Sequence, residues 1–324
     1  MRFKILDMPW NLNEQYELLR LPSVEWSWLV QYRVGYRLLR PELAGFFKWA
    51  PYYEGGRYDA AVLHLDLELI EPLPKALSRR RVYEELNGLV KDIPKIVIVH
   101  GSSPEAKCGW QEVRDLIGDN YAVVGSDAIA ERLGAGHVIM PGVLADDWPD
   151  SPKEPRVVTN LSQATGAGVE LVESLRVALE ERDIILCRIG VDYLPNTWEE
   201  YRDFLGRSLI YFAPPAYSER PKMEAASSGC CVLSPGPPGR AANFDEYVVS
   251  TEPEEIAGLV EDLITDPAEA RRVGREMRDT ARRRYDWGRY AQQWMRSLET
   301  VVEGRTALRP AHYSRRGAGP EFAR

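Results

Sequence analysis

Several charged side chains gather at the expected start of a short helix in the second half of the chain. Arg220, Lys222 and Glu224 open this helix, and Glu219 lies just before it. The apolar run 208–212 predicts a strand upstream, so the intervening loop should lie at the carboxyl end of a sheet, where α/β folds bind ligands. Cations and free backbone N–H groups there can bind a diphosphate, and a carboxylate can accept hydrogen bonds from a ribose diol. A capped helix with solvated charges explains the same residues equally well.

A pair of glycines follows another expected strand. Gly166 and Gly168 come after the apolar residues 156–161 and open a helix. Together with Asp192 they form part of a dinucleotide-binding fingerprint, in which Leu171 occupies the third glycine position. We favour the simpler interpretation that these glycines make a tight left-handed turn.

A histidine ends the clearest strand of the first half. His100 closes the β-branched run that begins at residue 94, which makes it a candidate to orient or deprotonate an acceptor hydroxyl. A histidine hydrogen-bonded within a loop is an equally good interpretation. Lys107 is a second candidate for the same region. Ser102 and Ser103 follow His100, but the chain has no Gly-x-Ser-x-Gly elbow, so a hydrolase triad is disfavoured.

Two other groups of residues are open to a functional interpretation. His64, Asp66 and Glu68 alternate with leucines, and the alternation favours a half-exposed strand over a metal site. We therefore predict no structural zinc and no essential metal. Most aromatic residues between positions 10 and 53 are expected to be core, and Trp10 and Trp49 are left as candidates for an acceptor groove.

Alternating strand and helix patterns must position all these residues. Short apolar runs alternate with helical segments along the chain, which is typical of parallel sheets covered on both faces. The pattern restarts after residues 146–155, which contain three prolines. We predict an α/β protein with two Rossmann-like, doubly wound domains facing a cleft, 1–148 and 156–304. A linker, 149–155, joins them, and a flexible tail, 305–324, follows.

Composition narrows the class of protein. The 324 residues suit two domains, and the net charge of −8 disfavours general nucleic-acid binding. The arginines between 271 and 289 are interrupted by acids and predict a solvated helix face. No apolar run reaches the ~20 residues of a membrane span, and no signal peptide is evident, so we expect a cytoplasmic protein that at most binds the membrane periphery. Cys230 and Cys231 are adjacent in an apolar run and should be buried on opposite faces of a strand.

A longer motif surrounds the charged helix. The segment Pro221-x-x-Glu224-Ala225-x-x-x-Gly229-Cys230-x-Val232-Leu233-Ser234 resembles the C-terminal signature of GT-B glycosyltransferases of the family 4, or "group 1", kind. Its first half, with Arg220, is also similar to the CgeB-like branch. The resemblance continues through Thr265-Asp266-Pro267, an arginine-rich helix and Tyr285-Asp286-Trp287. It covers residues 205–298 well and the earlier part weakly.

The resemblance implies a reaction and a division of labour. The second domain would bind a sugar linked to UDP or GDP, and the sugar would pass, with retention, to an acceptor hydroxyl bound by the first domain. No cofactor beyond this co-substrate is implied. The acceptor stays open between a glycan, a lipid, a small molecule and a modified DNA base, as do the donor sugar and the oligomeric state.

The resemblance also assigns roles to residues. Glu224 would contact the ribose, with Ala225 beside it, and Arg220, Lys222 or Arg188 would bind the diphosphate together with the loop at Gly166 and Gly168. The family has a second glutamate eight positions before Glu224, where this chain has Ala216, and Glu219 or Tyr217 would substitute for it.

Two alternatives stay open. The first is a degenerate GT-B scaffold that binds a nucleotide or a partner without turnover, because the family's first glutamate is missing and the loop 162–168 lacks arginine and lysine. The second is an NAD-dependent enzyme that uses Gly166 and Gly168.

Overall fold

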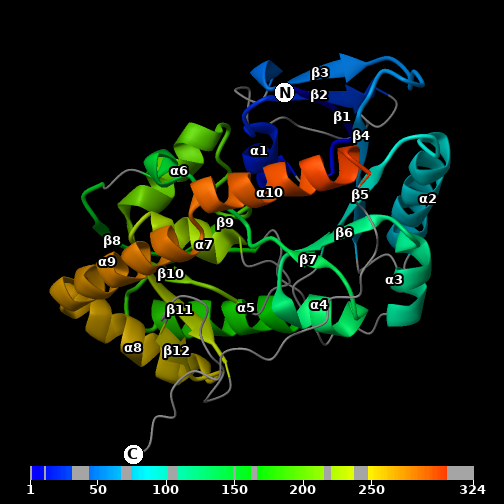
Figure 1. The fold of residues 1–324 in the computed structure, drawn as a ribbon. Coiled ribbons are helices and arrows are strands. Elements are labelled where there is room, and N and C mark those ends of the chain that lie inside the picture. Colours follow the sequence, from blue (N-terminus) through cyan, green and yellow to red (C-terminus); the bar gives the residue numbers. More distant parts are fainter. Residues whose placement is uncertain are drawn as a thin grey trace, which may run out of the picture.

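The computed structural model describes residues 2–10, 12–30, 44–66, 74–100, 109–148, 151–161, 166–214, 220–236 and 247–304. Two parallel sheets lie in different halves of the chain (Figure 1). This confirms the predicted α/β class with parallel sheets. The domain limits stay a prediction, and the tail from 305 lies outside the described residues.

The first sheet has seven strands with β1 and β4 near its centre. Its order is β3 (Phe47–Ala50), β2 (Val24–Leu29), β1 (Phe3–Asp7), β4 (Ala60–Asp66), β5 (Lys95–His100), β6 (Tyr121–Val124) and β7 (His137–Val138). Helices cover both faces: α1 (Leu12–Leu19) lies on one, and α2 (Pro74–Leu89), α3 (Trp110–Ile117) and α4 (Asp127–Leu133) lie on the other. The central strands are therefore buried on both sides.

The second sheet has five strands in the order β12 (Tyr247–Val249), β11 (Cys231–Pro235), β10 (Ser208–Phe212), β8 (Glu154–Asn160) and β9 (Leu186–Ile189). Its helices are α5 (Gly166–Glu180), α6 (Trp198–Arg207), α7 (Arg220–Ser227), α8 (Pro253–Thr265) and α9 (Pro267–Arg284). Asp266 caps α9 by accepting a hydrogen bond from the Ala268 amide, and Pro267 occupies the first turn, where its missing N–H costs nothing.

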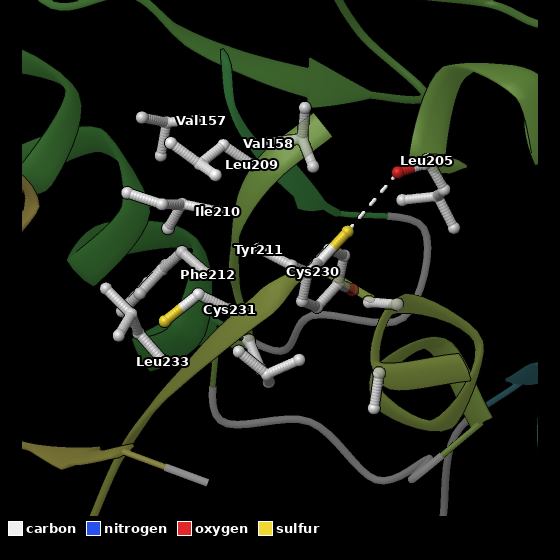
Figure 2. Packing of buried hydrophobic residues seen from close by; sticks show 14 of the residues in the cluster. Val157, Val158, Leu205, Leu209, Ile210, Tyr211, Phe212, Cys230, Cys231 and Leu233 are labelled. Carbon is white, nitrogen blue, oxygen red and sulfur yellow. Dashed lines mark hydrogen bonds between the residues drawn. The ribbon is translucent and has the colours of Figure 1, made fainter. Parts of the chain in front are cut away.

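The core of the second sheet confirms the predicted role of two cysteines. Cys230 and Cys231 are fully buried, and Figure 2 shows their sulfurs pointing in opposite directions. The Cys230 Sγ lies 3.3 Å from the carbonyl oxygen of Leu205. Burial raises the pKa of Cys231 to about 12, so this thiol is a packing group and not a nucleophile.

The last helix leaves the second domain and packs on the first sheet. In α10 (Trp287–Val302), Trp294, Leu298 and Val301 share a buried cluster with residues of β1, β4 and β5. Figure 1 shows this helix as the orange and red ribbon beside α1. The approach is close, because a Cβ added to Gly142 would lie 2.7 Å from Tyr290.

The structure corrects one expectation about helix α9 and one about the aromatic segment. Most of the arginine-rich helix α9 is solvated as predicted, but Arg278 is buried and donates a hydrogen bond to the Trp148 carbonyl. The aromatic segment is more regular than expected, since it contains β2 and β3; Trp26 and Trp28 in β2 are core residues, as predicted. No helix in the described ranges has the length and apolarity needed to cross a bilayer.

Candidate functional site

A buried ionic cluster, called here the Arg220 cluster, joins the two halves of the chain. It consists of Glu17, Tyr201, Arg220 and Glu224. Arg220 begins α7, and its Nε donates to Glu224 Oε1 at 2.8 Å while Nη2 donates to Glu17 Oε1 at 2.9 Å. Arg220 and Glu224 lie four residues apart on one helix, which places them on the same face. Glu17 comes from α1, 203 positions away in the sequence.

The second Glu224 oxygen is also occupied within this cluster. Tyr201 in α6 donates its hydroxyl proton to Glu224 Oε2 at 3.0 Å. Burial, with the Glu224 carboxylate beside it, raises the pKa of Tyr201 well above its usual value, so the hydroxyl remains a donor. Burial alone would lower the pKa of Arg220, but the Glu224 and Glu17 carboxylates outweigh it and raise that pKa. The cluster is thus one cation held by two carboxylates.

A second buried polar cluster, the His64 cluster, lies at the carboxyl ends of β1, β4 and β5. It consists of Asp7, Gln15, His64 and His100. His64 Nε2 lies 2.8 Å from Asp7 Oδ1, and His64 Nδ1 lies 2.7 Å from His100 Nε2. His64 is 1% exposed, so the expected half-exposed strand is wrong: β4 is central and covered on both faces. His100 is partly exposed at the end of β5.

The two clusters are connected by α1. Gln15 donates from Nε2 to Asp7 Oδ2, and Glu17, two residues later, accepts from Arg220. Residues two apart on a helix point to different sides, so one helix can serve both clusters.

The predicted glycine loop has another geometry than expected. Gly166 and Gly168 lie in the first turn of α5, so the tight left-handed turn is wrong. Arg188 in β9 is held by Asp192 through two hydrogen bonds of 2.8 Å and also pairs with Glu173. The Arg188 hydrogen bonds lower the pKa of Asp192 to about 2. Arg188 and Asp192 therefore stabilise the turn after β9 in this conformation.

The remaining predicted residues fall into two groups. Ala225 on α7 is fully buried, and Lys222 on the same helix is partly exposed. Trp10 stacks over His64, with ring centroids 6.0 Å apart, and Trp49 packs edge-on against neighbouring aromatic rings. Outside the described residues, or with side chains outside them, lie Asp66, Glu68, Ser102, Ser103, Lys107, Ala216, Tyr217 and Glu219.

The sequence offered weak signals for the residues that were missed. Asp7 is an acid at the end of a buried strand, and this position is the signal that the sequence carried for it. Gln15, Glu17 and Tyr201 lie in ordinary helical sequence and gave none. Among the residues whose side chains are described, no three His, Cys, Asp or Glu side chains form a group able to hold a metal ion. The metal-free expectation stays a prediction.

The chain is similar to known proteins in part of its sequence and in its fold. Residues 170–296 match a family model described as "Glycosyl transferase-like". A comparison with curated proteins gave no match. Among solved structures, the chain is similar to Anabaena HepE in complex with UDP and glucose, at 13% identity and a TM-score of 0.62, over 93% of this chain and 100% of that one.

Two further structures show the same likeness. Sucrose-phosphate synthase from Thermosynechococcus elongatus is 12% identical with a TM-score of 0.61, and the match covers 94% of this chain and 100% of that chain. A glycosyltransferase from Rickettsia africae is 13% identical with a TM-score of 0.61, over 93% and 99%. The likeness at these identities shows the fold, and the CgeB-like branch stays a prediction. Residues 170–296 thus match the glycosyl transferase-like family, and the fold of the chain is that of the GT-B glycosyltransferase structures, as the motif after Arg220 predicted.

Proposed function

We propose that the chain transfers a sugar from a nucleoside-diphosphate donor, with UDP as the first candidate nucleotide, to an acceptor hydroxyl. The observation that carries this proposal is the match of residues 170–296 to the glycosyl transferase-like family, which includes the helix with Glu224 at the carboxyl end of β10. The similar HepE structures are complexes with UDP and glucose or with UDP-glucose, which supports the choice of nucleotide.

Under this proposal, the second domain binds the nucleotide and Glu224 accepts the ribose hydroxyls. Because both Glu224 oxygens already accept hydrogen bonds, the ribose must replace Tyr201 or share an oxygen with it. Arg220 is enclosed by two carboxylates, so Lys222, partly exposed on the same helix, is the better placed cation for the diphosphate. Backbone N–H groups at the start of α5 add to the binding of phosphate.

On the first domain, His100 would contact the transferred sugar or the acceptor hydroxyl, and the first domain would bind the acceptor. Catalysis would then consist of positioning and of stabilising the leaving diphosphate. We expect retention of the anomeric configuration, which NMR of the product reveals, and no loss of transfer in EDTA.

Thermal unfolding with UDP, GDP, ADP, dTDP, CMP and NADH tests nucleotide binding first. A ligand at ~100 times its Kd that binds only the folded chain adds about 2.7 kcal/mol, which raises the midpoint visibly. A shift with UDP, followed by hydrolysis of UDP-glucose, supports the proposal. A shift with NADH alone would favour the dinucleotide alternative, which the pairing of Asp192 with Arg188 already disfavours.

Three variants test the role of Glu224. Glu224→Gln should weaken UDP binding, whereas Tyr201→Phe should preserve or strengthen it because Glu224 Oε2 is released. Glu199→Gln, exposed on α6, is the matched control and should change nothing. If Glu224→Gln binds UDP as tightly as the unaltered chain, the ribose role is wrong.

One observation favours a second candidate. Glu224, Arg220 and Arg188 all bind other side chains of the protein. Such pairing is compatible with a degenerate scaffold that binds a nucleotide without turnover. A UDP-induced shift without any hydrolysis or transfer across UDP- and GDP-sugars would favour this candidate.

A further inference from the structure

The hydrogen bonds around Asp7 fix where the protons lie in the His64 cluster. The Trp10 amide donates to Gln15 Oε1 at 2.7 Å, which sets the orientation of the Gln15 side-chain amide. Gln15 Nε2 then donates its two protons, one to Asp7 Oδ2 at 2.9 Å and one to the Met8 carbonyl at 2.7 Å. Although Gln15 Nε2 also lies 3.2 Å from His64 Nε2, it has no proton left for that nitrogen.

His64 must therefore be the donor in its contact with Asp7. Asp7 accepts from the Met8 amide, from Trp28 Nε1 at 3.1 Å, from Gln15 and from His64 Nε2. Four N–H groups thus point at one carboxylate. A neutral His64 that is protonated at Nε2 carries its lone pair at Nδ1.

The position of the proton on His64 also determines the position of the proton on His100. Its Nε2 lies 2.7 Å from His64 Nδ1, and only one of these two nitrogens can supply the proton. In the neutral form of His64, Nδ1 holds a lone pair, so His100 Nε2 is the donor and the lone pair of His100 lies at Nδ1. Among the described residues, the titratable groups that contact His64 are Asp7 from β1 and His100 from β5; Gln15 from α1 and the Trp10 ring are neutral neighbours.

We propose that Asp7 and His64 are positioning residues that hold His100 in the tautomer protonated at Nε2, so that His100 Nδ1 accepts a hydrogen bond from a hydroxyl of the sugar or the acceptor. This inference rests on the proposed function for the identity of the hydroxyl, and on geometry alone for the tautomer. Asp7 is fully buried behind His64, so it acts only through the two imidazoles. A buried carboxylate is suited to fix the tautomer of a histidine in this way.

Nitrogen-15 NMR of the full chain tests the tautomers directly. The sequence contains only four histidines, and His64→Gln, His100→Gln and His137→Gln assign their signals. Near neutral pH, His64 and His100 should both show a protonated Nε2 and a bare Nδ1. A neutral His100 that carries its proton at Nδ1 in the unaltered protein would overturn the proposal.

Asp7→Asn then tests the cause. The asparagine amide can donate to His64 Nε2, which moves the His64 proton to Nδ1 and forces His100 to carry its own proton at Nδ1. Both tautomers should therefore reverse. Trp28→Phe, which removes another donor to Asp7, is the control and should leave both tautomers unchanged. If Asp7→Asn folds and neither tautomer changes, Asp7 does not set them.

Activity separates this inference from the proposed function. If the chain turns over UDP-glucose, Asp7→Asn should lower kcat at least tenfold, with the KM for the donor and the binding of UDP unchanged. A change of kcat within twofold would refute the positioning role. If UDP neither binds nor is turned over as a sugar donor, the proposed function fails, while the NMR tautomers still decide whether Asp7 and His64 fix His100.

Discussion

Removing the charge of Arg220 should be among the most damaging single substitutions in the chain. Arg220→Met keeps a side chain of similar length but removes every donor, so Glu224 loses the cation it pairs with and Glu17 keeps the longer contact with Arg20 Nη1 at 3.9 Å. The side chains of Arg220, Glu17 and Glu224 are at most 4% exposed. Removing one partner from a buried ion pair costs about 3–5 kcal/mol, because the remaining charge has neither water nor a counterion.

A second substitution, Glu17→Gln, tests this reasoning through the sign of its effect on the free energy of unfolding. Glu17→Gln alone should destabilise the chain by about 1–3 kcal/mol, since it weakens a hydrogen bond with a charged donor. In the Arg220→Met background, the same substitution should stabilise the chain, because it removes one of two buried carboxylates that have both lost Arg220. Glu17→Gln should therefore reverse its effect between the two backgrounds.

Urea unfolding followed by circular dichroism at pH 7.5 measures these free energies. Arg272→Met, in an exposed network with Glu269 and Glu276, is the control and should leave the free energy of unfolding almost unchanged. A loss below 1 kcal/mol in Arg220→Met, or further destabilisation on adding Glu17→Gln, would refute the account of the cluster.

Two other predictions concern packing and pH. Gly274→Ala should lower the stability measured by thermal unfolding by about 1–3 kcal/mol or more, because the new Cβ collides with the backbone carbonyl of Gly229. The control is Gly258→Ala, which has open space around it and should be neutral or gain about 0.4–1 kcal/mol. Equal effects at both sites would contradict the packing. The pKa of Asp192, lowered to about 2 by the Arg188 hydrogen bonds, lies below its ordinary value, so its contribution is present above about pH 4 and is lost as the pH falls toward 2. Asp192→Asn should therefore lose less stability between pH 4.5 and pH 2.5 than the unaltered chain, as urea midpoints would show, and an identical loss would argue against the shifted pKa.

Local patterns were sufficient for most of the second half of the chain. Pro253 and Pro267 occupy the first turns of α8 and α9, and Asp266 and Asp286 cap α9 and α10, so local residues mark where these helices begin. In the first half, the aromatic sequence concealed β2 and β3. There, Val24–Leu29 alternates apolar and polar residues, which is a strand signal that its tryptophans obscured.

The candidate site was predictable only where its contacts are local. Arg220 and Glu224 are four residues apart on one helix, so the motif alone places them together. Glu17 reaches Arg220 from 203 positions away, and Asp7, His64 and His100 meet because their strands are neighbours in one sheet. Such meetings depend on strand order, which no local pattern contains. The leucines beside His64 suggested a half-exposed strand for the same reason. Because β4 is central, both of its faces are buried, and its alternation of polar and apolar residues does not mark an exposed face.

Helix α1, which has eight residues, links the two buried clusters, so that they move together. Gln15 fixes the Asp7 carboxylate that orients His64, and Glu17 holds Arg220 of the second domain. A shift of α1 that breaks the Glu17 contact would also move Gln15 away from Asp7, because a short helix moves as a rigid body. The contact between the domains and the tautomer of His100 should therefore change together. Under the proposed function, the catalytic side chain of the first domain would be correctly protonated only while the nucleotide-binding domain is in place.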